Sequence, residues 1–291
     1  LARMGVRIDL NSLKRGFYPR GGGEVCFSVN APTCPLQSLQ LVVRGAASAV
    51  TLHIFGQGKI KEELSSTYLE GVKAELGALV GLSPEEVVAA VTCSVDVDSW
   101  RRDSDGNTAS ANGGAAGGAA GGAAAAAASA ARGDAAGGGR GGRKRERGGR
   151  GKGWRDRAAG KQSESFTLGV QVAVQTVTGA VLSANALRSD KRGREPLSVL
   201  ECLAEVKAKL QLLWGSGAAV DEHTADQLVM YMTLSAGVSR ILVAPERTGE
   251  SSRHLETVAV LAKQLLGVDV SIDEQQNGCR LIQCEGLGLA G

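Results

Sequence analysis

The sequence predicts an α/β (α+β) fold, because segments with the two-residue repeat of strands alternate along the chain with segments that have a helical repeat. Residues 6–10 and 24–30 alternate apolar and polar side chains, as half-buried strands do. Residues 65–81 and 251–267 instead carry apolar residues three and four positions apart, as amphipathic helices do. Such alternation of strands and helices is typical of the α/β and α+β classes.

The first two expected strands enclose a glycine-rich stretch, RGFYPRGGGEV, at residues 15–25. A phosphate-binding loop of the common kind needs a following helix and a Lys-Ser or Lys-Thr pair, and neither comes after Gly23. Glycine adopts positive φ without steric cost, and Pro19 fixes the start of a turn. We therefore expect a long β-hairpin, and we favour a structural turn over a ligand-binding loop.

Four elements are expected between the hairpin and the middle of the chain. Two strands, at residues 39–45 and 50–56, precede a helix at 65–81, which Ser65 or the next serine can cap. The β-branched residues of 85–97 predict a further strand. The apolar stripe of the expected helix consists of Tyr68, Val72, Leu76 and Leu79.

A low-complexity tract occupies residues 103–162, which are nearly all Ala, Gly, Arg and small polar residues. Such residues offer little apolar surface to bury, so we expect a disordered insertion in a loop between two strands. The tract leaves roughly 230 residues to fold. Its Arg-Gly part, with Trp154, could bind RNA through phosphate contacts and stacking, but we favour a solvated linker.

Beyond the tract, residues 165–187 predict two strands joined near Thr178 and Gly179. Residues 197–215 predict a helix that ends at Gly215. The last third predicts a helix, a strand, a second helix and two strands, at residues 221–237, 239–244, 251–267, 268–272 and 279–286. The buried stripe of the second of these helices is expected to be Leu255, Val258, Leu261 and Leu265.

Composition argues against several classes of protein. The formal net charge is only +3, with basic residues concentrated in 140–161. The cysteines lack CxxC spacing, so we expect reduced intracellular thiols and neither a disulfide framework nor a zinc site. No signal peptide or membrane-spanning apolar run is present, so we expect a soluble intracellular protein without a membrane partner. Because the chain begins at Leu1 and not at Met, we expect a fragment or a gene model cut short at its start.

The chain has three histidines, and two of them have structural explanations. His53 has alternating strand spacing, and we expect it to be structural. His223 lies beside acidic residues at the expected start of the helix at 221–237, but the HExxH spacing of a zinc site is missing, so we assign no metal there. Thr224 and Gln227 fit a capping box, which gives Gln227 a structural explanation as well.

The third histidine, His254, falls in the expected first turn of its helix, beside Ser251, Ser252 and Arg253. A helix N-terminus disfavours imidazolium and attracts anions, so a neutral imidazole there would meet a bound phosphate as a nucleophile. The alternative is an exposed histidine without a catalytic role. Position alone favours this alternative and leaves the nucleophile open.

A resemblance to a known family rests on four motifs in a fixed order, RGFYPRGGGEV at 15–25, VDEHTADQL at 220–228, GVSRI at 237–241 and RHLET at 253–257. Together they resemble the C-terminal half of the RNA 3′-terminal phosphate cyclases. The ending LIQCEGLG, at 281–288, is similar to that of the eukaryotic members. The resemblance covers most of the chain outside the low-complexity tract.

The resemblance implies a fold and a division into domains. The family is built from repeated βαβαββ units, similar to those of enolpyruvyl transferases, with a smaller thioredoxin-like insert domain. Residues 1–45 would then end one unit, residues 46–215 would form the insert domain, and residues 216–291 would complete the last unit. The glycine run would be a hairpin turn within this fold and not the phosphate-holding element.

The resemblance also implies an activity, the ATP-dependent conversion of an RNA 3′-phosphate into a 2′,3′-cyclic phosphodiester. This is a ligase reaction of RNA processing, in which a histidine attacks the α-phosphate, the covalent histidine–AMP passes AMP to the RNA 3′-phosphate, and the adjacent 2′-OH displaces it. ATP and Mg²⁺, or another divalent cation, are the implied cofactors, and RNA with a 3′-phosphate end is the implied partner. The implied location is the nucleoplasm, with the cytoplasm as alternative.

His254 is the histidine that matches the family's nucleophile. The family's nucleotide-binding stretch falls on His223, Thr224, Ala225, Asp226 and Gln227. His223 stands where the family has an aromatic residue, usually tyrosine, which resembles a stacking surface for adenine. An imidazole can still stack, although it offers less area.

Two departures from the family pattern limit this assignment. The segment 244–254 is a few residues longer than the family's approach to its histidine. The family's first half, with its acidic metal ligand and phosphate-binding arginines, has no counterpart, so we expect this polypeptide alone not to catalyse. Two alternatives remain: a non-catalytic cyclase-like ribosome-biogenesis protein acting in pre-rRNA processing, which His254 disfavours because that paralogue lacks the nucleophile, and an RNA-binding module that uses the Arg-Gly tract.

Overall fold

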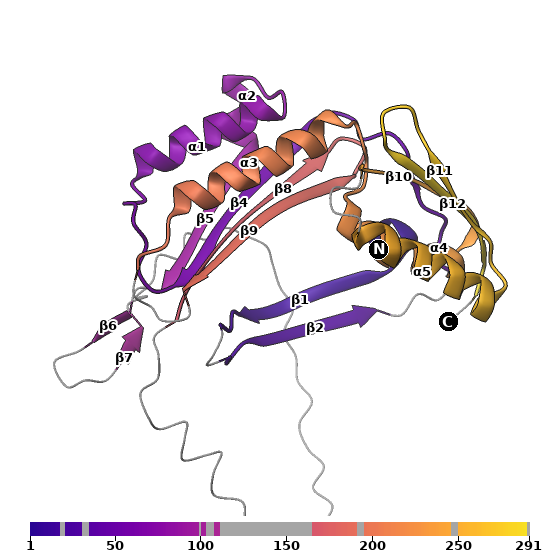
Figure 1. Cartoon of the computed structure of the whole chain (residues 1–291), viewed down its shortest axis with the longest axis horizontal. Helices are drawn as coiled ribbons and strands as arrows, with labels where there is room; N and C mark the ends of the chain where they lie inside the picture. Colours follow the sequence, from indigo (N-terminus) through magenta and orange to yellow (C-terminus); the bar gives the residue numbers. More distant parts are fainter. Residues whose placement is uncertain are drawn as a thin grey trace, which may run out of the picture.

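The computed structural model describes residues 1–17, 21–30, 35–98, 100–102, 108–110, 165–190, 195–245 and 250–289. Strands and helices alternate through this part of the chain, which confirms the predicted mixed α/β class. Two of its sheets have helices packed against them and form two lobes, each with its own hydrophobic core (Figure 1).

The first lobe is built on the sheet with strand order β5-β4-β8-β9. Strand β4 lies parallel to β5 and antiparallel to β8, which pairs antiparallel with β9. Helices α1, α2 and α3 cover one face of this sheet (Figure 1), where they bury alternate residues of the strands such as Leu52 and Val172. The bounds are β4 Ala47–Gln57, α1 Ser66–Leu79, α2 Pro84–Ala90, β5 Val91–Asp98, β8 Phe166–Thr176, β9 Val181–Asp190 and α3 Val199–Gly215.

Helix α1 forms as its sequence predicts. The hydroxyl of Ser65 caps it by accepting a hydrogen bond from the N–H of Tyr68 at 3.3 Å. Val72 and Leu76 of the predicted stripe are buried, and Tyr68 and Leu79 are partly buried against the same core. Burial of this stripe fixes the helix on the sheet.

Helix α2 corrects the prediction that residues 85–97 form one strand, because only the part from Val91 onward is a strand. Ser83 and Glu86 form a capping box, in which the Ser83 hydroxyl accepts from the Glu86 N–H at 3.3 Å and the Glu86 carboxylate accepts from the Ser83 N–H at 2.7 Å. Pro84 occupies the first helical position, where its missing N–H costs nothing. These start signals outweigh the β propensity of the valines that follow.

The second lobe is built on the sheet with strand order β11-β12-β10-β3. Strand β10 lies parallel to β3 and antiparallel to β12, which pairs antiparallel with β11. Helices α4 and α5 pack side by side, and Met232 and Leu255 from them share a core with Ile241 and Ile282 of the sheet (Figure 1). The bounds are η1 Ala2–Met4, β3 Gln40–Leu41, α4 Glu222–Leu234, β10 Ala236–Val243, α5 Glu250–Leu261, η2 Ala262–Leu266, β11 Val270–Glu274 and β12 Arg280–Leu287.

Only the first half of the stripe predicted for α5 is buried. Leu255 is buried and Val258 packs against the same core, but Leu261 is 44% exposed and Leu265 is 76% exposed. The next buried position is Ala262, at 6% exposure, where the π-helical turn η2 begins. The prediction is wrong for the two leucines because the stripe passes through Ala262 and the wider turn then changes which side chains face the core.

Strand β12 approaches the end of α4 closely at Gly286. A Cβ atom at this position would lie 2.2 Å from the carbonyl oxygen of Ser235 and 2.4 Å from that of Met232. These are backbone atoms at the end of α4, so they cannot move aside as a flexible side chain could. Glycine at this position therefore lets α4 lie directly on the sheet.

The predicted hairpin is present as strands β1, Arg7–Lys14, and β2, Glu24–Asn30, which pair antiparallel. Gly21 and Gly22 have φ of +64° and +77°, and the Gly21 N–H donates to the Phe17 carbonyl at 2.8 Å. This geometry supports a structural turn. Residues 18–20, which include Pro19, lie outside the described residues.

The hairpin strands are not half-buried as their alternation predicts. Leu10 is 60% exposed and Phe27, which faces it in the ladder, is 62% exposed. All of β2 is exposed to solvent. The reason is that β1 and β2 form a two-stranded sheet of their own, and none of their residues belongs to the hydrophobic core of either lobe in the described chain.

A stacked pair joins the segments that connect the two lobes. The guanidinium of Arg44, which lies just before β4, is 3.6 Å from the ring centroid of Trp214 near the end of α3. Arg44 also donates to the Trp214 carbonyl, and the Thr178 hydroxyl donates to the Arg44 carbonyl. Cation–π stacking and a charged hydrogen bond together link the segment just before the first strand of the first lobe to the end of its last helix, α3.

Within the tract at 103–162, the structure describes residues 108–110 only. They form strand β7, Thr108–Ser110, which pairs antiparallel with β6, Trp100–Arg102. A backbone ladder of this kind can form without apolar side chains, and disorder of the tract stays a prediction. The rest of the predicted insertion, with Trp154, lies outside the described residues.

Candidate functional site

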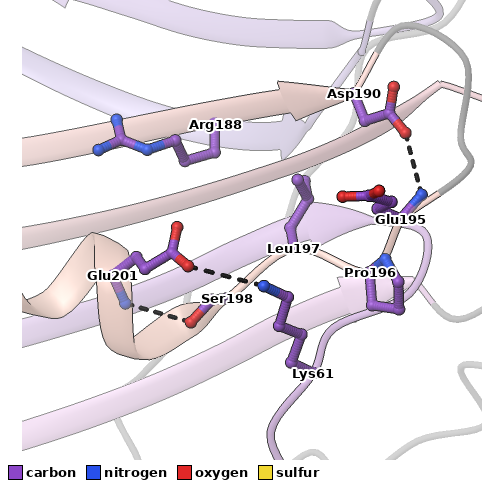
Figure 2. A pocket seen from close by; sticks show the side chains of 8 residues that line it. All are labelled: Lys61, Arg188, Asp190, Glu195, Pro196, Leu197, Ser198 and Glu201. Carbon is purple, nitrogen blue, oxygen red and sulfur yellow. Dashed lines mark hydrogen bonds and ion pairs between the residues drawn. The ribbon is translucent and has the colours of Figure 1, made fainter.

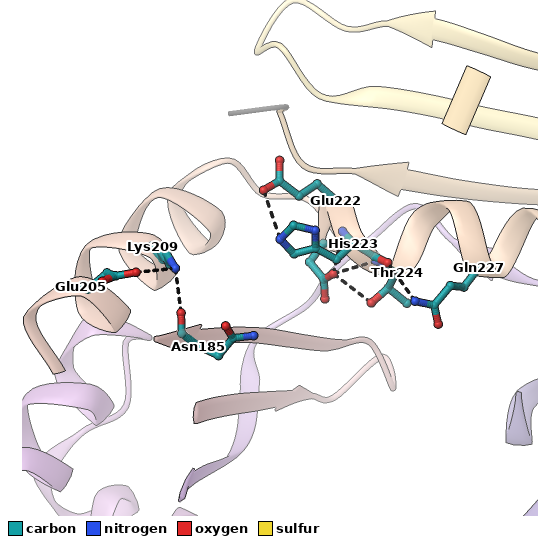
Figure 3. A network of polar contacts seen from close by, with 8 residues as sticks. Asn185, Glu205, Lys209, Glu222, His223, Thr224 and Gln227 are labelled. Atoms are coloured by element: carbon teal, nitrogen blue, oxygen red, sulfur yellow. Dashed lines mark hydrogen bonds and ion pairs between the residues drawn. The ribbon is translucent and has the colours of Figure 1, made fainter. Parts of the chain in front are cut away.

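Helix α4 carries the five residues of the expected nucleotide-binding stretch, and its start differs from the predicted capping box of Thr224 and Gln227. Asp221 is the N-cap, and its Oδ1 accepts from the N–H of His223 at 3.1 Å and of Thr224 at 2.9 Å. The Thr224 hydroxyl donates to the same oxygen at 2.9 Å (Figure 3). A carboxylate is a better cap than the expected pair because it accepts several hydrogen bonds at once, and its negative charge interacts favourably with the positive end of the helix dipole.

These contacts divide the stretch into buried and exposed positions. The methyl group of Ala225 is 1% exposed in the core of the second lobe, and the Thr224 hydroxyl is engaged by Asp221. His223 has an exposed side chain, with its Nε2 3.6 Å from Oε1 of Glu222 (Figure 3). The Gln227 amide, also exposed, donates to the His223 carbonyl one turn back at 3.3 Å. His223 and Gln227 are thus the members whose side chains are open to a ligand.

His254 lies in the second turn of α5, not in the first turn as predicted, because the helix begins at Glu250. The unpaired N–H groups at a helix start belong to its first turn, so they do not surround the imidazole directly. Thr257, the threonine of the RHLET motif, donates its hydroxyl to the Arg253 carbonyl at 2.5 Å. The hydroxyl of the motif's threonine is therefore bonded to the backbone of its own helix and not to the imidazole of His254.

Packing of α4 against α5 brings the two predicted motifs together. Oδ2 of Asp226, on α4, lies 3.9 Å from Nδ1 of His254, on α5. The Asp226 side chain is 26% exposed and that of His254 is 73% exposed. The candidate site is therefore the outer surface of these two helices, where the expected nucleophile and the expected nucleotide-binding stretch meet.

His53 does not belong to this candidate site. It lies in the first lobe, whereas α4 and α5 belong to the second lobe. It sits on β4 opposite Ser94 of β5, and its Nδ1 is 2.5 Å from the Ser94 hydroxyl. Sequence spacing showed no hydroxyl neighbour, because Ser94 reaches His53 only through strand pairing. A cross-strand hydrogen bond of this kind supports the structural role that was expected.

A cavity of about 320 Å³ lies in the first lobe, beside the start of α3 (Figure 2). Nζ of Lys61 is 3.6 Å from Oε1 of Glu201, and the backbone N–H of Glu195 donates to the Asp190 carboxylate at 3.1 Å. The lining residues are Lys61, Arg188, Asp190, Glu195, Pro196, Leu197, Ser198 and Glu201. Since it shares no residue with the predicted site, we do not place the chemistry there.

The nearby start of α3 is filled by a carboxylate of the chain itself. Glu62 accepts hydrogen bonds from the Ser198 hydroxyl at 2.5 Å and from the Val199 N–H at 2.7 Å. Burial acts to raise the pKa of the Glu62 carboxyl, but the hydrogen bonds from Ser198, Val199 and Leu200 outweigh burial and lower it. This helix end is thus already satisfied and offers no anion site.

The described residues offer neither a cluster of metal ligands nor a membrane-spanning helix. No group of three or more His, Cys, Asp or Glu side chains gathers there in a way that could hold a metal ion. No helix there is long and apolar enough to cross a membrane.

Comparison with known proteins decides the family. A family model described as RNA 3′-terminal phosphate cyclase matches residues 1–272. The chain belongs to the RNA 3′-terminal phosphate cyclase family. It is 30% identical over 120 residues to the RNA 3′-terminal phosphate cyclase of Drosophila melanogaster, a match that covers 41% of this chain and 30% of the relative. This confirms the family indicated by the motifs.

Two bacterial relatives of the cyclase family extend the comparison. The chain is 38% identical over 93 residues to the Ralstonia nicotianae protein of the same name, covering 30% of this chain and 26% of the relative. The match to the Nitrosospira multiformis protein is 25% identical over 281 residues and covers 96% of this chain and 56% of the relative. The matched part is therefore about half the length, or less, of these cyclases.

The contact between Asp226 and His254 is the feature of the site that sequence reasoning missed. Asp226 was expected to bind nucleotide, and nothing in its spacing from His254 along the chain indicates proximity. The resemblance places both residues at one ATP site, but it does not predict their direct contact, because a single sequence does not specify the faces through which two amphipathic helices pack.

Proposed function

We propose that the protein converts an RNA 3′-terminal phosphate into a 2′,3′-cyclic phosphodiester, using ATP and a covalent adduct on His254. Membership of the cyclase family supports the reaction class. The observation that carries the assignment to this site is the 3.9 Å approach of Asp226, in the nucleotide-binding stretch, to His254. Two motifs separated in sequence meet at one surface, as a nucleotidyl-transfer site requires.

The proposed chemistry has three bond exchanges. A ring nitrogen of His254 attacks the α-phosphorus of ATP, and the bond to the leaving pyrophosphate breaks. An oxygen of the RNA 3′-phosphate then attacks the same phosphorus and releases the histidine. The neighbouring 2′-OH attacks the RNA 3′-phosphorus, loses its proton, and displaces AMP. A histidine suits this sequence because its bond to phosphorus is reactive enough to pass AMP onward.

A divalent cation, which the resemblance implies, would offset charge on the phosphates when bound. Because the described residues gather no group of three metal-ligating side chains, we assign it no ligands and derive no step from it. What the chain itself supplies is the nucleophile His254 and the exposed His223 and Gln227 on the adjoining helix.

A cyclisation assay tests the proposed function in the full natural protein. RNA with a 3′-phosphate is incubated with ATP and Mg²⁺, and conversion is followed as resistance of the end to phosphatase. We expect ATP-dependent resistance with an ordinary 3′-terminal ribose. When the terminal sugar is 2′-deoxy, no hydroxyl can attack the phosphorus, so the reaction should stop at the adenylylated 3′-phosphate, which the larger mass of the RNA distinguishes from a cyclic end.

The same assay separates this function from the non-catalytic alternative, a cyclase-like protein of ribosome biogenesis that acts in pre-rRNA processing. His254 favours the enzyme, because that paralogue lacks the nucleophile. RNA binding without any ATP-dependent change at the 3′ end would contradict the cyclase and support the alternative.

Nucleotide binding by α4 gives a further prediction. Replacing His223 by tyrosine is expected to keep or tighten ATP binding, because a larger ring offers more stacking area. Gln227→Ala is expected to weaken binding by roughly 3- to 10-fold, the effect of losing one hydrogen bond. Isothermal titration calorimetry measures both. The matched control is Gln211→Ala, at an exposed position of α3 in the other lobe, which should leave ATP affinity unchanged.

Two outcomes would overturn these roles. Loss of ATP binding in His223→Tyr together with normal binding in His223→Ala would show that stacking is the wrong role. Equal weakening by Gln227→Ala and Gln211→Ala would show that the effect is not local to α4.

We also propose the finer fold assignment and the location. The element order β3, α4, β10, α5, β11, β12, with the first lobe placed between β3 and α4, supports a βαβαββ unit similar to those of enolpyruvyl transferases. The order β4, α1, β5, β8, β9, α3 in one sheet-and-helix layer supports a thioredoxin-like insert domain at residues 46–215. An RNA-processing role supports a nuclear location, with the cytoplasm as alternative.

A further inference from the structure

The contact between Asp226 of α4 and His254 of α5 involves one particular ring nitrogen of the histidine. The atom 3.9 Å from Oδ2 of Asp226 is Nδ1. The other oxygen of the carboxylate, Oδ1, accepts a hydrogen bond from the Gln227 N–H at 2.8 Å. Asp226 is therefore held by its own helix with its second oxygen turned toward the histidine of the neighbouring helix.

Partial burial makes this pair different from a freely exposed one. The Asp226 side chain is 26% exposed and therefore largely covered, whereas the His254 ring, at 73%, remains accessible. The separation is longer than a hydrogen bond. Catalytic hydrogen bonds are often long in the absence of substrate and shorten when the substrate binds, so a small movement of the accessible ring suffices.

A carboxylate beside Nδ1 selects one form of a neutral imidazole. The carboxylate can only accept, so the ring must carry its proton on Nδ1 to make the contact. The lone pair then sits on Nε2, on the side of the ring away from Asp226. This is the atom that can attack a phosphorus.

We infer that Asp226 is a positioning residue that keeps the proton of His254 on Nδ1 and thereby presents Nε2 to the α-phosphate. This inference rests on the proposed function of His254. As the bond between Nε2 and phosphorus forms and the bond to pyrophosphate breaks, the ring gains positive charge while its Nδ1 proton stays in place. The neighbouring carboxylate stabilises that charge, and no additional proton acceptor is needed in this step.

The competing explanation is that Asp226 and His254 are only neighbours at the surface and that Asp226 does not control the proton of the ring. Surface ion pairs contribute little energy and do not fix one geometry. The chain contains an internal comparison, because His223 approaches Glu222 through the opposite nitrogen, Nε2, at 3.6 Å. The two histidines should therefore differ in tautomer if these carboxylates select it.

Nitrogen-15 NMR of the histidine rings tests the inference without relying on catalysis. With three histidines in the chain, the signals are assigned from His53→Ala and His223→Ala spectra. At a pH where the rings are neutral, we expect His254 mainly as the Nδ1–H form. Asp226→Ala should shift it toward the Nε2–H form and leave His223 unchanged, and Glu222→Gln should affect His223 only. Asp226→Asn, which keeps the shape of the side chain, guards against a folding effect.

A kinetic measurement in the full natural protein then connects the tautomer to the reaction. Asp226→Ala is expected to slow adduct formation at saturating ATP by roughly 10- to 100-fold, the scale on which a misplaced reacting group slows catalysis. Measuring the rate at saturating ATP separates this role from a contact of Asp226 with the nucleotide, because loss of such a contact would weaken ATP binding without slowing the saturated step.

The outcomes for the two proposals can be told apart. A His254 tautomer that does not respond to Asp226→Ala, or a rate that does not fall, would overturn the positioning role even if His254 is adenylylated. Absence of any adduct in the wild type would contradict the proposed function, while the NMR result would still decide whether Asp226 controls the ring.

Discussion

Replacing His254 by alanine is expected to abolish the covalent protein–AMP adduct and, with it, RNA cyclisation. Loss of a covalent nucleophile removes the intermediate altogether, so the effect should be complete and not a partial slowing. Incubation of the full natural protein with α-labelled ATP and Mg²⁺ should label the wild type with an acid-labile, alkali-stable bond. The His254→Ala variant should carry no label.

The other two histidines provide the matched controls. His53→Ala removes a ring that bonds Ser94 in the other lobe, and His223→Ala removes an exposed ring on α4. Both variants should retain labelling, reduced in His223→Ala if ATP binds less tightly. A label that persists in His254→Ala would show that another residue is the nucleophile.

A second large effect is expected from Gly286→Ala. The added methyl group would overlap the carbonyl oxygens of Ser235 and Met232, at 2.2 and 2.4 Å, and α4 would have to move away from the sheet. We expect the free energy of unfolding to fall by about 3 kcal/mol or more, the upper end of the range for overpacking. Urea unfolding followed by circular dichroism measures the loss, and hydrogen exchange of β12 amides localises it to the second lobe.

The same change at Gly71 is the control, with the opposite sign expected. Gly71 lies inside α1, and a Cβ there meets nothing within 4 Å. Alanine should stabilise that helix by about 0.5 to 1 kcal/mol. A Gly286→Ala variant as stable as the wild type would show that the close approach of β12 to α4 is not needed.

Local signals in the sequence predicted most elements correctly. Alternation located β4 and β8, and a serine cap with an apolar stripe located α1. Helix α2 was missed although its Ser83, Pro84 and Glu86 form a recognisable start signal, because the valines beside them favoured a strand. The sequence therefore contained the signal for this helix, and the error was to give more weight to the β propensity of the valines.

Other features depend on packing and could not be predicted from local signals. The buried stripe of α5 passes through Ala262 instead of Leu261, and only the position of the helix on the sheet decides between them. The need for Gly286 arises because α4, more than fifty residues earlier, ends against β12. The alternation of apolar residues in the hairpin likewise does not predict whether another part of the protein packs against its apolar face.

The candidate site shows the same division. His254 and the stretch from His223 to Gln227 could be identified from motifs, and their roles stay predictions. Burial of Ala225, capping by Asp221 and the approach of Asp226 to Nδ1 of His254 came only from the arrangement of α4 and α5. Motifs therefore gave the candidate residues, and the packing of the two helices showed which of them lie close together.

The most direct test of the central claim is to locate AMP on the protein. The full natural protein is incubated with ATP and Mg²⁺, digested under alkaline conditions that preserve the bond, and analysed by tandem mass spectrometry. We predict that the mass of AMP is found on the peptide that contains His254, with fragment ions placing it on that residue. AMP on a lysine or on another histidine, or an intact protein without added mass, would contradict the claim.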